Sequence, residues 1–274
     1  MKAVGTCVFT DFLCTEGKRM LEFRFEGTKF EESWSRKALE SFYEEGWIEE
    51  VLYRVKGGKE ATVYCCQVDP ETGYDLVAAK IYRHRGLRSM KNYESYRDGR
   101  FVTTDKRKLR AIKNKSRYGK QSMDSAWIDS EFTFFQTFFR AGADVPEPIA
   151  AGPHSMLMDF VGDREAAAPT LHEVRLDTSE VRPLFDRIIE NVATFLAYNL
   201  IHGDLSAFNI LYWEGDFRVI DFPQAISPPE NPNAFQSLVR DVERVCQYFE
   251  KLGVRESYFD IAEDLWNRYL TRSL

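Results

Sequence analysis

Residues 200–211 read LIHGDLSAFNIL, and residues 218–226 read RVIDFPQAI. In these two segments Asp204, Asn209 and Asp221 stand at the edges of apolar runs that are typical of buried strands. A charge beside a core costs free energy unless another group pairs with it. We therefore predict that the three side chains hold a metal–nucleotide complex.

The spacing of the polar residues fits this chemistry. Asp204 and Asn209 are five positions apart, the D-x-x-x-x-N spacing of a kinase catalytic loop. In such a loop Asp204 orients the acceptor hydroxyl or takes its proton, and the amide oxygen of Asn209 binds Mg²⁺, which prefers hard oxygen ligands. Asp221 would add a carboxylate to the same metal. His202 is predicted to be a core histidine bonded to the backbone, and Phe222, Pro223 and Gln224 to be packing and turn residues.

Two upstream segments predict a phosphate-binding region. Lys80 lies in the apolar strand LVAAKIY, where an unpaired ammonium is costly, so we expect nucleotide phosphates and the helix acid Glu131 as its partners. By position alone, Glu131 fits a solvated helix acid equally well. In KGGKEATVY (residues 56–64), Gly58 permits close backbone approach and Lys59 supplies a point charge. A GG pair by itself also fits an ordinary hairpin turn.

The order of elements predicts an α+β, bilobed, protein-kinase-like fold. After an N-terminal extension at 1–46, a sheet-rich N-lobe at about 47–157 carries strands and one helix from about residue 125 to 140. A helix-rich C-lobe follows at about 162–274, which makes 47–274 the kinase-like domain. Helical spacing predicts helices at 31–45, 181–200, 234–252 and 257–270.

Charge is distributed unevenly along the 274 residues, whose net charge is −6. Residues 83–120 hold fourteen Lys and Arg against three acidic residues, which predicts either a mobile, solvated insertion or an electrostatic patch that binds phosphates or RNA. The five cysteines form no C-x-x-C, and we read neither an export signal nor a membrane span. These features favour a cytoplasmic protein with no membrane partner.

The ordered set GGKEATVY, AAKIYR, W-x-x-x-E, PEPI, LMDFVG, HGDLSAFNIL and IDFPQAI resembles the RIO kinases, which are atypical serine/threonine protein kinases and ATPases. The resemblance implies ATP and Mg²⁺ as cofactors, Asp204 as catalytic aspartate, and Asn209 and Asp221 as metal ligands. It also implies that Asp221 can accept phosphate. Backbone groups near Asp159 and Val161 would bind adenine, and a long activation segment would be absent. Ribosome maturation is the role that the family suggests.

Several features keep other readings open. The catalytic-loop sequence and the 83–120 insertion resemble one RIO subgroup, whereas DFPQ and the later NPNA and RDV segments resemble another. HGD-x-x-x-x-N-I-L followed by I-D-F also resembles small-molecule kinases of the aminoglycoside and choline type. A slow, nucleotide-gated binding module is a third reading. The acceptor would be a protein, or the chain itself.

Overall fold

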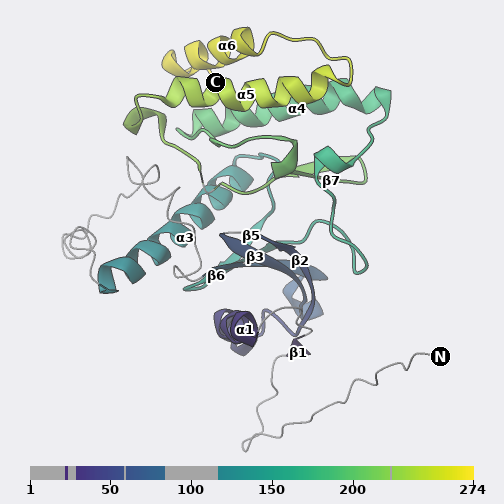
Figure 1. Ribbon diagram of the computed structural model, residues 1–274, viewed down its shortest axis with the longest axis vertical. Helices are drawn as coiled ribbons and strands as arrows, with labels where there is room; N and C mark the ends of the chain where they lie inside the picture. Colours follow the sequence, from purple (N-terminus) through teal and green to yellow (C-terminus); the bar gives the residue numbers. More distant parts are fainter. Residues whose placement is uncertain (1–21, 24–28, 59, 84–116, 223) are drawn as a thin grey trace, which may run out of the picture.

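The computed structural model describes residues 22–23, 29–58, 60–83, 117–222 and 224–274, in two lobes (Figure 1). The larger sheet follows the order β1-β2-β3-β4-β6-β5, in which β1 is parallel to β2 and the other neighbours are antiparallel. Its strands are β1 (Glu22–Phe23), β2 (Glu50–Gly57), β3 (Ala61–Gln67), β4 (Leu76–Tyr82), β5 (Pro148–Ala151) and β6 (Ser155–Asp159). All side chains of β4 are buried, as its apolar sequence predicts.

Helix α1 (Lys29–Glu44) covers the face of this sheet that points away from the C-terminal helices (Figure 1). Leu39 and Phe42 of the helix are buried in one cluster with Leu157 of β6. Gly46, at φ 81°, lets the chain turn after the helix. The helix therefore packs on the N-lobe, although its sequence falls in the segment predicted as an N-terminal extension.

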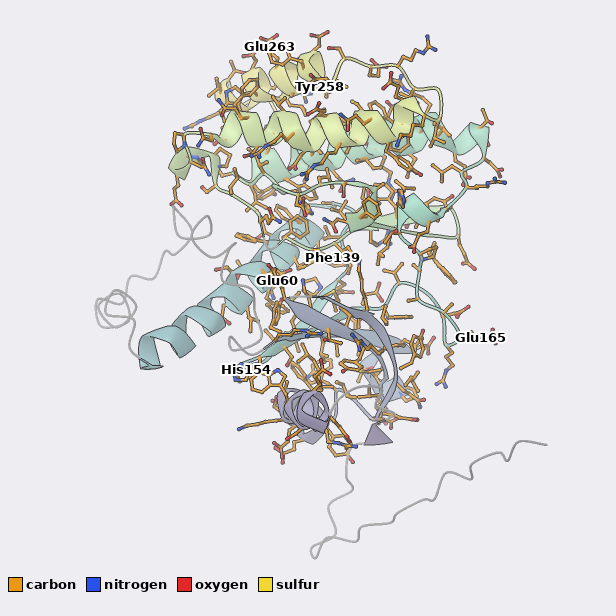
Figure 2. All side chains as sticks on the ribbon, in the orientation of Figure 1. Glu60, Phe139, His154, Glu165, Tyr258 and Glu263 are labelled. Carbon is orange, nitrogen blue, oxygen red and sulfur yellow. The ribbon has the colours of Figure 1, made fainter. Side chains whose placement is uncertain are left out.

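Helix α3 (Arg117–Arg140) joins the two lobes. It begins eight positions before residue 125, where the helix was predicted to begin. The prediction missed the first turns because they have no apolar periodicity from which a helix could be predicted. Ile128, Phe135 and Phe138 are buried in the same cluster as the C-lobe core. Phe139, on the last turn, lies between the sheet and the upper helices (Figure 2).

The C-lobe stacks α4 (Thr178–Ala197), α5 (Ala234–Glu250) and α6 (Tyr258–Leu270), as Figure 1 shows. Helix α4 begins three positions earlier than predicted, because Asp177 and Glu180 form a capping box there. The small sheet of β7 (Ile210–Trp213) and β8 (Asp216–Val219) lies below these helices. Within the described residues no helix is long and apolar enough to cross a membrane.

Asp144, in the loop after α3, ties that helix to the C-lobe. The Asn191 amide of α4 donates to Oδ2 of Asp144 at 2.7 Å, and Nε of Arg187 donates to the same oxygen at 2.9 Å. The backbone N–H of Val219, at the end of β8, donates to the Asp144 carbonyl at 2.7 Å. These bonds fix the end of α3 relative to β8, after which Asp221 follows.

Candidate active site

The ammonium of Lys80 joins the two lobes at the site. Its Nζ donates to Oε1 of Glu131 on α3 at 2.7 Å and to Oδ1 of Asp221 at 2.9 Å. Burial lowers the pKa of Lys80, but the two carboxylates outweigh it and raise that pKa above its ordinary value. The lysine thus stays charged in a buried strand, and Glu131 is a buried partner rather than a solvated acid.

Asp221 has a strained backbone and a half-exposed side chain. Its φ is 69°, in the left-handed region that side chains other than glycine rarely adopt. Burial raises the pKa of its carboxyl, but Lys80 opposes this and the net pKa is lowered. Since its side chain is 46% exposed while Lys80 holds one oxygen, the carboxylate is ionised and accessible to a ligand.

The loop that carries Asp204 is fixed by Asp241 of α5. The buried carboxylate of Asp241 accepts hydrogen bonds from the backbone N–H of Gly203 at 2.7 Å and of Leu205 at 3.0 Å. Gly203 is required here because its φ is 79°, and a Cβ would lie 2.3 Å from the carbonyl oxygen of Gln224. Asp204 is therefore held between two anchored neighbours.

His202 supports the same loop from the core. Its Nδ1 accepts from the Asp204 N–H at 3.3 Å, so Nε2 carries the proton and donates to the Ile220 carbonyl at 3.1 Å. Burial lowers the pKa of this imidazole, which stays neutral. The ring packs on Phe222, with 4.6 Å between the centroids. The predicted core histidine, bonded to the backbone, is confirmed, and so is the packing role of Phe222.

Asp204 and Asn209 lie in the C-lobe loop that precedes β7. The Asn209 amide nitrogen donates to the backbone carbonyl of Asp204 at 2.8 Å, so the amide oxygen is the atom left to bind a ligand. The carboxylate of Asp204 accepts from Nη1 of Arg244 at 2.6 Å and makes a long contact of 3.5 Å with the Gln224 amide. Gln224, predicted as a turn residue, thus also lies beside Asp204.

The ligand chemistry of this region fits Mg²⁺. The amide oxygen of Asn209 and the carboxylate of Asp221 are hard oxygen donors. Proteins commonly hold Mg²⁺ with one or two such groups, and phosphates and water complete the octahedron. The described residues contain no cluster of three or more His, Cys, Asp or Glu side chains, which such a two-ligand site does not require.

The remaining predicted residues lie in the β2–β3 hairpin and in the connection after β6. In the hairpin between β2 and β3 the N–H of Gly58 donates to the Ala61 carbonyl at 2.8 Å, and Lys59 lies outside the described residues. In the connection after β6 the N–H of Asp159 donates to the Glu147 carbonyl. The carbonyl of Val161 accepts from Ala168. Roles for these residues in nucleotide binding stay predictions.

Three residues that contact the predicted site residues were not identified from the sequence pattern alone. Tyr82 donates from its hydroxyl to Oε2 of Glu131 at 2.8 Å, Asp241 anchors the catalytic loop, and Arg244 pairs with Asp204. Asp241 stands in an R-D-V segment, a signal that could have found it. No pattern in the sequence around Tyr82 or Arg244 indicates their contacts with Glu131 and Asp204.

Comparisons with known proteins give the family of this chain. A family profile described as the RIO domain matches residues 62–262. The RIO-type serine/threonine-protein kinase Rio2 of Methanocaldococcus jannaschii is 30% identical over 86% of this chain and 80% of the relative. Rio1 of Haloferax volcanii is 29% identical over 85% of this chain and 74% of the relative. For rio1 of Schizosaccharomyces pombe the identity is 29%, over 80% of this chain but only 42% of the longer relative.

Solved structures show the fold. The crystal structure of a Rio2 kinase–ADP/Mg²⁺–phosphoaspartate complex from Chaetomium thermophilum superposes with a TM-score of 0.59 at 23% identity. The match covers 88% of this chain and 71% of that chain. Another structure of the same kinase gives a TM-score of 0.58. The predicted bilobed kinase-like fold is confirmed, and the chain passes from β8 to α5 without a long activation segment.

Proposed function

Because the chain belongs to the family of RIO-type serine/threonine protein kinases, we propose that it transfers the γ-phosphoryl group of ATP. The observation that carries the proposal is the ammonium of Lys80, which binds Glu131 of one lobe and Asp221 of the other. Phosphoryl transfer needs a cation on the phosphates, oxygen ligands for the metal and an oriented acceptor. This site has a candidate for each.

In this proposal the ligands of the nucleotide and the metal come from both lobes. Lys80 would bind the nucleotide phosphates, and backbone groups near Gly58, with Lys59, would cover them. Asp159 and Val161 would bind adenine through their backbone. Asn209 and Asp221 would hold Mg²⁺, which when bound neutralises the charge that develops on the phosphates.

Asp204 is the proposed general base when the phosphoryl group passes to a protein hydroxyl. The hydroxyl oxygen attacks the γ-phosphorus while the bond from that phosphorus to the β–γ bridging oxygen breaks. ADP leaves, and the hydroxyl proton passes to the carboxylate of Asp204. Because Gly203 and Leu205 are anchored by Asp241, this carboxylate has little freedom to move away from the acceptor.

Asp221 is the proposed acceptor when no protein hydroxyl is bound. One of its oxygens attacks the γ-phosphorus, ADP leaves, and an aspartyl phosphate forms. Water then hydrolyses the acyl phosphate, with Asp204 taking a proton, and phosphate is released. The half-exposed, ionised carboxylate of Asp221 supports this second path, which would make the chain a slow ATPase.

Labelled ATP separates the proposed outcomes. The chain is incubated with γ-labelled ATP and Mg²⁺, and the label is followed to protein, small molecules or free phosphate. We expect label on serine or threonine, or as a hydroxylamine-sensitive acyl phosphate that the Asp221→Asn variant lacks. Label on an aminoglycoside or choline would instead identify a small-molecule kinase. Turnover no greater than that of Asp221→Asn would overturn the proposal.

The proposed partners are a protein acceptor, or the chain itself, and ribosomal RNA of a pre-ribosome. The RNA contact is assigned to residues 83–120, where fourteen basic residues stand against three acidic ones. Most of this segment lies outside the described residues. We place the protein in the cytoplasm, since Cys65, Cys66 and Cys246 are free thiols.

A further inference from the structure

The side chain of Asp204 is held by a residue that the reaction outlined above does not use. Nη1 of Arg244, on α5, donates to Oδ1 of Asp204 at 2.6 Å. Asp241, three positions earlier on the same helix, fixes the backbone on both sides of Asp204. Since positions i and i+3 share a helix face, α5 contacts both the backbone and the carboxylate of the catalytic loop.

Arg244 has N–H donors that its hydrogen bond to Asp204 does not use. A guanidinium has five N–H donors, and the hydrogen bond to Asp204 uses one of them. The side chain of Arg244 is 43% exposed and that of Asp204 is 38% exposed, so both are open to an incoming acceptor. The acceptor hydroxyl must reach the Asp204 carboxylate and will meet this guanidinium beside it.

Arg240 adds a second cation one turn earlier on the same face of α5. It is exposed and donates to uncharged atoms, the Gln236 carbonyl at 3.3 Å and the Ser237 hydroxyl at 2.9 Å. In the described part of the chain no carboxylate forms an ion pair with it. Arg244 pairs with Asp204, so among the described residues the charge of Arg240 is left without a carboxylate partner one turn away on α5.

We propose that Arg240 and Arg244 bind an acidic protein segment and select a serine or threonine with carboxylates beside it. This inference rests on the proposed kinase function. A carboxylate of the acceptor would bind the unused donors of Arg244 by charge-assisted hydrogen bonds and compete with Asp204 for the Nη1 donor. Oδ1 of Asp204 is then free to accept the hydroxyl proton. Recognition of the acceptor and release of the base occur in the same event.

An acidic peptide fits this surface better than a nucleic acid does. Binding of RNA needs a row of cations along a phosphate backbone. On α5 the two arginines are interrupted by the acids Asp241 and Glu243. A pair of cations suits one or two carboxylates of a short segment.

The test compares two serine peptides that differ only in the residues flanking the serine, glutamate in one and glutamine in the other. We expect the parent protein to favour the glutamate peptide about tenfold in kcat/KM, as one charge-assisted contact provides. In the Arg240→Gln/Arg244→Gln variant this ratio should fall towards one. If the two arginines only positioned Asp204, the double variant would have a lower kcat for both peptides and an unchanged ratio of kcat/KM.

Charge reversal and a remote arginine complete the test. Arg244→Glu should reverse the preference, towards a peptide with lysines in the flanking positions. The matched control is Arg268→Gln, because Arg268 pairs with Asp264 on α6 and not with a predicted site residue, and should keep the parent ratio. Equal kcat/KM for the two peptides in the parent would overturn the inference. So would an unchanged ratio in the double variant.

Direct binding separates this inference from the proposed function. The anisotropy of the labelled glutamate peptide is measured with a non-hydrolysable ATP analogue present, where no turnover is needed. Tight binding that the double variant loses about tenfold supports the acidic-peptide surface even in a protein without kinase activity. Turnover without preference in binding or catalysis contradicts it. Displacement of the peptide by an RNA oligonucleotide, but not by an acidic peptide, would assign the pair to nucleic acid instead.

Discussion

The hydroxyl of Tyr82 donates a 2.8 Å hydrogen bond to Oε2 of Glu131, 49 positions away in the chain. Both side chains are buried, and the other oxygen of Glu131 accepts from Lys80. A carboxylate removed from water needs a partner on each oxygen to remain ionised at low cost. Tyr82 therefore satisfies the second oxygen of Glu131 and directs the carboxylate at the lysine of the proposed phosphate site.

Tyr82→Phe should destabilise the protein and weaken nucleotide binding. The variant leaves Oε2 of Glu131 buried without a donor, which costs about 1–3 kcal/mol in the free energy of unfolding. Urea denaturation and the Kd for ADP measure the two effects. The matched control is Tyr269→Phe, which removes an exposed hydrogen bond to Asn199 and should leave the Kd unchanged. A stable Tyr82→Phe variant with parent affinity would show that Glu131 needs no second donor.

Lys80→Met should cost about 3–5 kcal/mol in the free energy of unfolding, because it leaves the carboxylate of Glu131 buried and uncompensated. Replacing both members, as Lys80→Met/Glu131→Leu, should recover most of this stability without recovering nucleotide binding. Glu131→Gln alone should weaken binding less than Lys80→Met. Denaturation and calorimetric titration with ATP check both quantities. Recovery of nucleotide binding in the double variant would contradict the phosphate role of Lys80.

Asp204→Asn and Asp221→Asn should separate chemistry from metal binding. We expect Asp204→Asn to lower turnover about 10²–10⁴-fold, as loss of a general base does, and to leave ATP affinity unchanged. Asp221→Asn should abolish Mg²⁺-dependent turnover and remove the effect of Mg²⁺ on nucleotide affinity. Steady-state rates and titrations with and without Mg²⁺ give both readouts. Near-parent turnover in Asp204→Asn would show that its carboxylate is not the base.

The sequence predicted those parts of the site whose residue types are constrained locally. The spacing of Asp204, Asn209 and Asp221 and the apolar strand around Lys80 could be read directly, because each polar residue stands out in its own segment. Arg244 could not, because its contact with Asp204 spans 40 positions and depends on how α5 packs against the loop. An exposed arginine on an amphipathic helix looks the same whether it faces solvent or a catalytic residue.

The fold, like the site, could be predicted where the sequence pattern is local but not where it depends on long-range packing. Apolar periodicity predicted most helices and strands to within a few residues, whereas α3 extends through polar turns that have no such periodicity. That α1 belongs to the N-lobe core could not be read either. Its burial depends on the sheet face formed by distant strands, among them Leu157 of β6.

Asp241 should make stability depend on pH near neutrality. Burial raises the pKa of its carboxyl to about 7, against the two backbone hydrogen bonds that lower it. The folded protein then keeps this proton up to about pH 7, whereas the unfolded chain loses it near its ordinary pKa of about 3.9. Between these values the folded state binds more protons, so the free energy of unfolding falls as pH rises, by up to about 1.4 kcal/mol per unit.

Urea denaturation from pH 5 to pH 8 checks this dependence against Asp241→Asn. The variant has no proton to lose there, so the difference in free energy of unfolding between parent and variant should shrink as pH rises and level off above pH 7. Its overall stability will be lower, since an amide oxygen replaces a carboxylate that accepts two hydrogen bonds. A difference that stays constant with pH would show that Asp241 is already ionised at pH 5.

The basic segment at 83–120 gives the last prediction, which concerns RNA. If it binds RNA phosphates, each contact releases condensed counterions, so affinity should fall linearly on a log–log plot against salt. Neutralising four of its cations should reduce the slope by up to about 3, at about 0.7 per contact with a single strand. The four are Lys106, Arg107, Lys108 and Arg110. A control with the same change in net charge replaces the exposed C-lobe residues Lys251, Arg255, Arg268 and Arg272. It should keep the parent slope, and both variants should keep intrinsic ATP hydrolysis. RNA binding across a salt titration decides the matter, because equal slopes for the three proteins would leave the segment as a solvated insertion.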